Sequence, residues 1–100
     1  MRDIIFAIAA RHDLTAIWNY TADRWGLDQA DTYIRQIDNT IQHAAKFPGM
    51  GSEATGLPSQ YRKLISGSHR IIYRLSDTNL IVVRILHERQ DVPDDISDYW

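Results

Sequence analysis

The stretch YRKLISGSHRIIYRLSDTNLIVVRIL, residues 61–86, decides the fold of this 100-residue chain. It holds three runs rich in β-branched, aromatic and other apolar residues: Tyr61 to Ser66, His69 to Leu75, and Leu80 to Leu86. The breaks between them, Gly67-Ser68 and residues 76–79, are short and made of turn-forming residues. Connections this short make neighbouring strands antiparallel, so the sequence predicts a three-stranded antiparallel meander.

Two helical patterns precede the meander. The first runs from Arg11 to Trp25, and its apolar stripe is Leu14, Ile17, Trp18, Thr21 and Trp25. The second runs from about Gln29 to Lys46, and its stripe is Ala30, Tyr33, Ile34, Ile37, Ile41, Ala44 and Ala45. Gly26 suits a C-terminal cap and Asp28 suits the following N-cap. So short a connection predicts an antiparallel helix hairpin whose stripes form the core.

An apolar run from Ile4 to Ile8 begins the chain. We interpret it as a strand, because it is short for a secretory signal and Asp3 spoils the basic head of such a signal. Two helices return the chain to the end it left, so we expect this strand to lie antiparallel to the meander edge that it joins. The predicted fold is therefore α+β: an N-terminal strand, an antiparallel helix hairpin and a three-stranded antiparallel meander.

Composition narrows the functional classes. With 44% hydrophobic residues and no low-complexity tract, residues 1–100 are expected to form a single domain. The chain has no cysteine, which excludes disulfides and thiolate chemistry and favours a cytoplasmic protein. No apolar run approaches the roughly 20 residues that span a membrane, so no membrane association is expected.

Charge is distributed unevenly along a chain whose net charge is only -2. Residues 61–86 carry five basic and one acidic side chain, whereas residues 87–100 carry one basic and five acidic side chains. The low net charge argues against a general nucleic-acid binder. A basic sheet followed by an acidic tail, residues 92–100, predicts either a self-covering tail or a surface left free for an anionic partner.

Strand alternation assigns the two faces of the predicted meander. We expect the face against the helices to hold Ile71, Tyr73, Leu75, Ile81, Val83 and Ile85. The opposite face would hold Arg70, Ile72, Arg74, Leu80, Val82, Arg84 and Leu86. Apolar residues exposed among arginines are typical of a surface that a partner covers. The alternative is that the chain's own tail packs over this face through Ile96, Tyr99 and Trp100.

Motifs for catalysis or metal binding are weak. The four histidines lack metal-ligand spacing, so neither a metal nor another cofactor is expected. His69 and His87 could approach each other across the sheet, although a histidine satisfied by a backbone carbonyl is the commoner outcome. There is no GxSxG nucleophile motif and no glycine-rich phosphate loop.

Several short motifs together resemble those of ParE-type toxins of bacterial toxin-antitoxin pairs. They are Arg24-Trp25-Gly26 with the following Gln29-Ala30, then Gly67-Ser68-His69 with Ile71 and Tyr73-Arg74, then Ile85-Leu86-His87 with Arg89 and Asp91. The similarity extends from about Asp13 to Asp91. It implies the fold of the wider RelE/ParE superfamily: a strand, a helix hairpin and an antiparallel sheet.

The resemblance also implies a function, a growth-inhibiting toxin that poisons DNA gyrase and is neutralised by a ParD-like antitoxin. DNA would then be contacted only indirectly, through the antitoxin, whose helix would lie in an apolar groove of the toxin. On this interpretation the chain is a protein inhibitor and not an enzyme. The residues expected to face gyrase are His87, Arg89 and Asp91. Those expected to bind the antitoxin are Trp18, Arg70, Ile72, Arg74, Val82, Arg84 and Leu86.

RelE-like relatives provide the alternative, because they cleave messenger RNA at the ribosome. Arg62, Arg74, Arg84 and His87 would form such a ribonuclease site. The chain lacks the strong positive charge expected of a ribosome-binding ribonuclease, and Glu88 stands where an aromatic acid-base residue would be expected. A third possibility is an inactive toxin that only binds its antitoxin.

Overall fold

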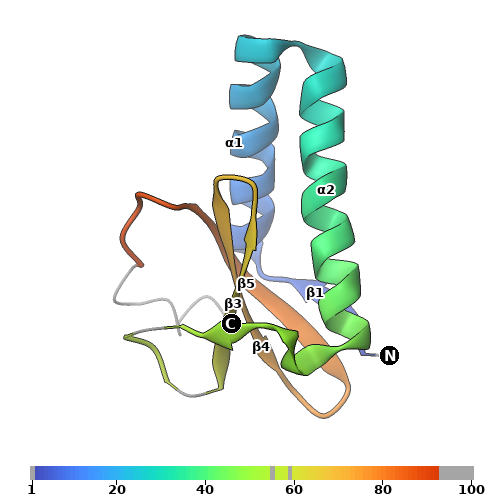
Figure 1. The fold of residues 1–100 in the computed structure, drawn as a ribbon, viewed down its shortest axis with the longest axis vertical. Helices are drawn as coiled ribbons and strands as arrows, with labels where there is room; N and C mark the ends of the chain where they lie inside the picture. The colour runs from blue at the N-terminus through green and yellow to red at the C-terminus, as the bar shows by residue number, and fades with distance from the viewer. Residues whose placement is uncertain (1, 55, 59, 93–100) are drawn as a thin grey trace.

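A helix hairpin packed on one mixed sheet makes up the fold (Figure 1). The computed structural model describes residues 2–54, 56–58 and 60–92. The sheet is five-stranded with the order β1-β5-β4-β3-β2, and the predicted α+β fold class is confirmed. The elements are β1 (Asp3–Phe6), α1 (Ile8–Trp25), α2 (Leu27–Lys46), the 3-10 helix η1 (Pro48–Met50), β2 (Ser52–Glu53), β3 (Tyr61–Ser66), β4 (His69–Leu75) and β5 (Asn79–His87).

A single glycine joins the two helices. Gly26 has a φ of +95°, a conformation that side-chain-bearing residues rarely adopt. Its N–H donates to the carbonyl of Ala22 at 2.9 Å, and its own carbonyl accepts from Ala30 at 3.1 Å. The expected cap at Asp28 is wrong, since Gly26 ends α1 and begins α2. Asp28 lies instead in the first turn of α2, where a carboxylate interacts favourably with the helix dipole.

The predicted stripe of α2 is confirmed, and that of α1 is confirmed only in part. Five residues of the α2 stripe are buried: Ala30, Ile37, Ile41, Ala44 and Ala45. In α1, Ile17 and Thr21 are buried, but the Trp25 side chain is 63% exposed. The helix hairpin extends beyond the sheet (Figure 1). The end of α1 therefore lies away from the core, although the helical spacing of Trp25 predicts that it is buried there.

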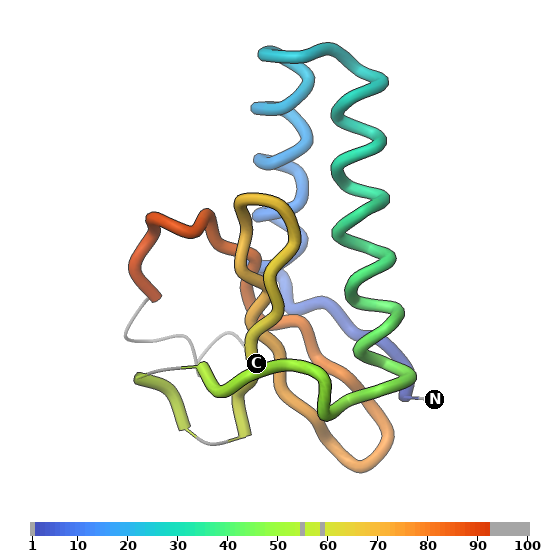
Figure 2. The backbone as a smooth tube through the Cα atoms, viewed as in Figure 1, coloured from blue at the N-terminus to red at the C-terminus, as the bar shows by residue number. Residues whose placement is uncertain are grey.

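The first strand is parallel to β5, so the expectation of an antiparallel edge is wrong. The reason is the reach of α2. Ile41 already lies beside Phe6, at the end of β1, in a shared groove, and α2 continues to Lys46. There the N–H of Arg2 donates to the carbonyl of Ala45 at 3.3 Å. The helix therefore returns the chain to the beginning of β1 and not to its end, as the backbone tube shows (Figure 2).

A short fifth strand was not predicted. In β2, Ser52 pairs with Lys63 and Glu53 pairs with Arg62, both antiparallel. The segment lies between glycines and prolines, which favour a loop reading. Gly51 permits its close approach, because a Cβ there would lie 2.9 Å from the carbonyl oxygen of Lys63.

A β-bulge reverses part of the predicted face assignment. Ile72 pairs with Arg84 and Tyr73 with Val82, so Val83 is an extra residue in β5. In the part of β5 before the bulge, the alternation of side chains between the two faces is therefore shifted by one residue from the prediction. Leu80 and Val82 therefore face the helices, and Ile81 and Val83 face away, the opposite of the prediction. Ile71, Tyr73, Leu75 and Ile85 lie on the helix side as predicted.

The face away from the helices is not open. Ile72 and Leu86 are each 1% exposed, within a second apolar cluster that includes Ala54 and Tyr61, with Leu57 and Val92 packed against it. The expectation that Ile72, Val82 and Leu86 are exposed is therefore wrong. Whether Ile96, Tyr99 and Trp100 cover this face lies outside the described residues. Of the helices in the described part of the chain, none is long and apolar enough to cross a membrane.

Candidate functional site

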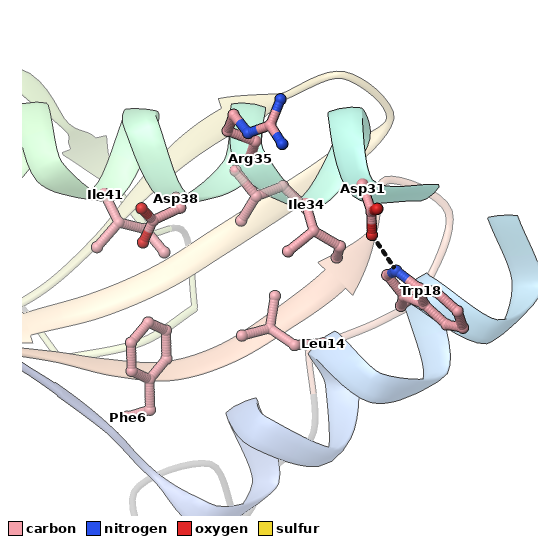
Figure 3. Close-up of a pocket in the computed structure, with 9 residues that line it drawn as sticks. Phe6, Leu14, Trp18, Asp31, Ile34, Arg35, Asp38 and Ile41 are labelled. Atoms are coloured by element: carbon pink, nitrogen blue, oxygen red, sulfur yellow. Dashed lines mark hydrogen bonds between the residues drawn. The ribbon is translucent and has the colours of Figure 1, made fainter. Parts of the chain in front are cut away.

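An apolar groove lies between the two helices and β1 (Figure 3). We call it the hairpin groove. Its volume is about 350 Å³, and its apolar lining consists of Phe6, Leu14, Trp18, Ile34, Ile37 and Ile41. All except Ile37 and Ile41 are half-buried, so much of this apolar surface is still accessible. A hydrophobic groove along a helix pair is a surface on which a partner helix can lie.

The rim of the hairpin groove is charged. Asp31, Arg35 and Asp38 project from α2 along it (Figure 3). The indole N–H of Trp18 donates to a carboxylate oxygen of Asp31 at 3.0 Å, which fixes the ring across the groove. Trp18, one of the residues expected to bind a partner, is thus held in position by the opposite helix. A rim with two carboxylates and one guanidinium favours a ligand with basic side chains.

Arg84 is part of an internal ion pair. Its Nε and Nη2 donate to the two carboxylate oxygens of Asp13 in α1, at 2.7 and 3.0 Å. The N–H of Ile85 donates to the same carboxylate at 2.9 Å. Asp13 therefore accepts a backbone hydrogen bond from the edge of β5 beyond the end of β1. The side chains of Arg84 and Asp13 are each only 15% exposed. The prediction that Arg84 lies on an open face is wrong.

The predicted ribonuclease residues are not brought together. Arg62 donates to the carbonyl of Gly51 at 2.8 Å and thereby holds the segment before β2. Arg74 is half-buried and pairs with Tyr61 and Ile81, at the end of β4 far from His69. His87 pairs with His69 of β4. His69 is five residues from Arg74 in the same strand, so His87 and Arg74 are about 16 Å apart along the strand direction. Arg84 is engaged by Asp13, so no described phosphate site includes all four.

The chain turns sharply after β5. The N–H of Gln90 donates to the carbonyl of His87, and the N–H of His87 donates to the Gln90 side-chain oxygen, both at 2.9 Å. Arg70 donates to the carbonyl of Gln90 and so ties this turn to β4. Arg89 and Asp91 are exposed on it. Two of the three residues expected to face gyrase thus project from a fixed turn.

His69 and His87 do lie together, as their strand positions allowed. Their rings are perpendicular with centroids 5.4 Å apart. The Tyr33 hydroxyl of α2 lies 2.6 Å from Nδ1 of His69, and the N–H of Ser68 donates to the same hydroxyl at 3.0 Å. Burial and, to a smaller extent, the neighbouring His87 lower the pKa of His69, which favours the neutral ring beside the Tyr33 hydroxyl. This cluster joins the β3–β4 hairpin to α2.

Two of these residues were missed by sequence reasoning. Asp13 is one of several surface acids in a helical pattern, and only the three-dimensional fold places it beside Arg84. The helical spacing of Tyr33 predicts an ordinary core residue. In the structure Tyr33 packs against Gly67, where a Cβ would lie 2.7 Å from the Tyr33 hydroxyl, but the sequence shows Gly67 only as a turn residue. Within the described ranges, no three His, Asp or Glu side chains are placed to hold a metal ion.

Known proteins resemble this chain over most of its length. Residues 4–92 match the family described as the ParE toxin of the type II toxin-antitoxin system parDE. The chain is 45% identical over 85 residues to Toxin ParE1 of Mycobacterium tuberculosis (strain CDC 1551 / Oshkosh), covering 84% of this chain and 87% of that protein. It is 40% identical over 79 residues to Toxin ParE1 of Caulobacter vibrioides, covering 79% and 81%.

The fold is also similar to a solved structure, the chromosomal ParDE toxin-antitoxin system from P. aeruginosa. The TM-score is 0.75, with 17% sequence identity, over 87% of this chain and 96% of that chain. At this identity the likeness concerns the fold alone.

Proposed function

The chain belongs to the ParE toxin family of type II toxin-antitoxin systems, and from that premise we propose that it arrests growth by poisoning DNA gyrase and is neutralised by a ParD-like antitoxin. The chain would act by binding and would catalyse no reaction of its own. The family match supports a toxin, and the observation that favours gyrase over the ribonuclease alternative is the ion pair between Arg84 and Asp13. A ribonuclease would need Arg84 for its phosphate site, but here Arg84 is bonded to α1 and is separated from Arg62 and Arg74.

The hairpin groove is the proposed site for the antitoxin. Its lining is apolar and its rim carries Asp31 and Asp38, so it fits an amphipathic helix with basic residues beside the apolar stripe. Trp18 is the proposed anchor, because its ring is half-buried and its indole N–H is already bonded to Asp31. Tryptophans in such central positions contribute strongly to binding.

The turn after β5 is the proposed contact with gyrase. Arg89 and Asp91 are exposed there, while the hydrogen bonds of His87, Gln90 and Arg70 hold the backbone in one conformation. A fixed backbone reduces the conformational entropy lost on binding. Gyrase and antitoxin would thus contact different regions of the toxin, the β5 end and the helix hairpin.

The test uses purified toxin, gyrase and supercoiled DNA, with translating ribosomes in parallel. We expect trapped cleaved DNA and uncut message. Addition of the cognate antitoxin should abolish the trapping. Arg89→Ala should reduce trapping by about tenfold and leave antitoxin affinity unchanged. Its matched control is Arg35→Ala, an exposed arginine on the groove rim.

Each outcome separates the alternatives. Ribosome-dependent message cleavage without DNA breaks would contradict the gyrase proposal and assign the activity to a ribonuclease. Silence in both assays, with antitoxin binding intact, would identify an inactive toxin. Equal losses for Arg89→Ala and Arg35→Ala would contradict the placement of the gyrase contact at the β5 end.

A further inference from the structure

A second hollow lies where the helix hairpin meets the tip of the β3–β4 hairpin. We call it the tip hollow. Its volume is about 300 Å³, and it shares no lining residue with the hairpin groove. It is lined chiefly by Tyr20, Trp25, Gln29, Tyr33, Ser68 and His87. We propose that the tip hollow binds a nucleobase, presented either by a free nucleotide or by a short single-stranded nucleic acid. This inference does not rest on the gyrase proposal.

Two exposed rings provide the stacking surface. Tyr20 is 55% exposed and Trp25 is 63% exposed, although both are large apolar residues. Their centroids are 6.3 Å apart with planes at 62°, an edge-to-face contact, and the Arg24 guanidinium lies over the Tyr20 ring. Trp25 is therefore the main stacking surface, and Tyr20 supports it from the side. Every base has a π-face, and bases stack on accessible aromatic rings of this kind.

The rest of the lining is polar and held by hydrogen bonds. Tyr33 is fixed by its contacts with Ser68 and His69. The N–H of Arg89 donates to Nδ1 of His87 at 3.2 Å, so the neutral His87 ring carries its proton on Nε2 and can donate from that atom. A fixed tautomer and a fixed tyrosine make a pre-organised surface, which lowers the entropic cost of binding.

Gln29 gives the hollow a means to distinguish bases. Its side chain is exposed and makes no hydrogen bond within residues 2–54, 56–58 and 60–92. A primary amide offers one donor and one acceptor side by side, which match the N6 and N7 atoms of adenine. We therefore expect adenine to bind more tightly than cytosine or uracil.

Charge limits the ligand to a short one. The Arg24 guanidinium lies over the Tyr20 ring, 5.0 Å from its centroid, which places one positive charge next to a lining residue of the hollow, within reach of a phosphate. The whole chain, however, has a net charge of -2, so a long phosphate backbone would find little attraction. Recognition would come from the base, with about one phosphate contact.

The test is a titration of the isotopically labelled full chain with AMP, CMP and UMP, and with a short single-stranded adenine oligonucleotide. We expect the Trp25 indole and Gln29 amide resonances to shift, with AMP bound more tightly than CMP or UMP. Trp25→Ala should weaken every ligand by about tenfold or more. Gln29→Leu should remove the preference for adenine and retain the stacking. The matched control, Leu27→Ala, changes a residue that is also 63% exposed but does not line the hollow, and it should change affinity less than about twofold.

The two sources of the base are distinguished by the same titration. Equal affinity for AMP and the oligonucleotide identifies a free nucleotide, and a tighter oligonucleotide identifies a single strand. A tenfold rise in salt should weaken the oligonucleotide by only about fivefold, the value for one phosphate contact. The absence of any shift at millimolar ligand would overturn the proposal. So would equal losses in Trp25→Ala and Leu27→Ala, with folding of each variant verified by circular dichroism.

Discussion

The two faces of the sheet differ less than their sequences indicate. One face packs on the helices, and Ile37 of α2 lies there with no exposed surface. The other carries arginines in β4, yet Ile72 on it is 1% exposed within the second apolar cluster. Strands buried on both sides need not alternate cleanly between apolar and polar residues. Arginine in a strand therefore does not identify an open surface in this protein.

The arginines of the sheet have structural partners. Arg84 bonds Asp13, Arg62 bonds the carbonyl of Gly51, and Arg70 bonds the carbonyl of Gln90. Each joins a strand to a neighbouring segment. The accessible apolar surface lies instead on the helix hairpin, in the hairpin groove and around Trp25. Both faces of the sheet therefore serve to hold the fold together, and recognition by the helices and the β5 end is what we propose.

The largest expected effect compares the two faces directly. Ile37→Asp and Ile72→Asp should each lower the free energy of unfolding by about 4 kcal/mol, because each buries a carboxylate among apolar side chains. Urea denaturation of the two variants measures this. Ile65→Asp, at a strand position that is 61% exposed, is the control. A nearly wild-type Ile72→Asp would mean that the second face is open in solution.

The next effect concerns the ion pair at the sheet edge. Arg84→Ala should cost about 2 kcal/mol of stability, since among the described residues it leaves the Asp13 carboxylate, which is 15% exposed, with the N–H of Ile85 alone. A double-mutant cycle with Asp13→Ala isolates the coupling between the two side chains. Arg89→Ala, on the exposed turn, should change stability by less than about 0.5 kcal/mol. If the two arginine variants lose the same stability, the internal role of Arg84 is wrong.

A smaller loss is expected at the junction of helix and strand hairpins. Tyr33→Phe removes the hydroxyl that contacts His69 and accepts from Ser68, and should cost about 1 kcal/mol. Thermal unfolding would measure it. Tyr20→Phe changes an exposed hydroxyl for which no hydrogen bond is described, and serves as its control.

The smallest expected effect is a pH dependence. The pKa of His69 is lowered in the folded state by burial and by His87, while Asp13 and Glu88 oppose the shift. The unfolded chain therefore binds this proton more readily, and stability should fall as the pH drops below about 6.5. The urea midpoint measured from about pH 7.5 to about pH 5.5 should fall less steeply in His69→Gln than in the wild type. Parallel profiles would show that another group causes the decline.

The sequence predicted the elements more reliably than their mutual placement. Periodicity located both helices and the three meander strands, because apolar spacing depends on local geometry. The one-residue bulge at Val83 has no local signal, and it displaced the face assignment of Leu80 to Val83. The direction of β1 depends on how far α2 continues past Ile41. That length is set by how the helix packs on the sheet, and the spacing of apolar residues does not reveal it.

The positions of candidate site residues could be anticipated where pairing along strands decided them. His69 and His87 came together because their strands are neighbours in the meander. The prediction failed for Arg84, whose partner Asp13 is 71 residues away in the sequence. Trp18 was named by resemblance, and the structure places it in the hairpin groove. Its role in binding stays a prediction.

The most direct test of this assignment compares antitoxin affinity for Trp18→Ala and Ile65→Ala, measured by calorimetry with the cognate antitoxin. Trp18 lies in the hairpin groove, and Ile65 is an exposed apolar residue of β3 on the face away from the helices. We predict a loss of about tenfold or more for Trp18→Ala and less than about twofold for Ile65→Ala. The reverse order would contradict the account and return antitoxin recognition to the sheet.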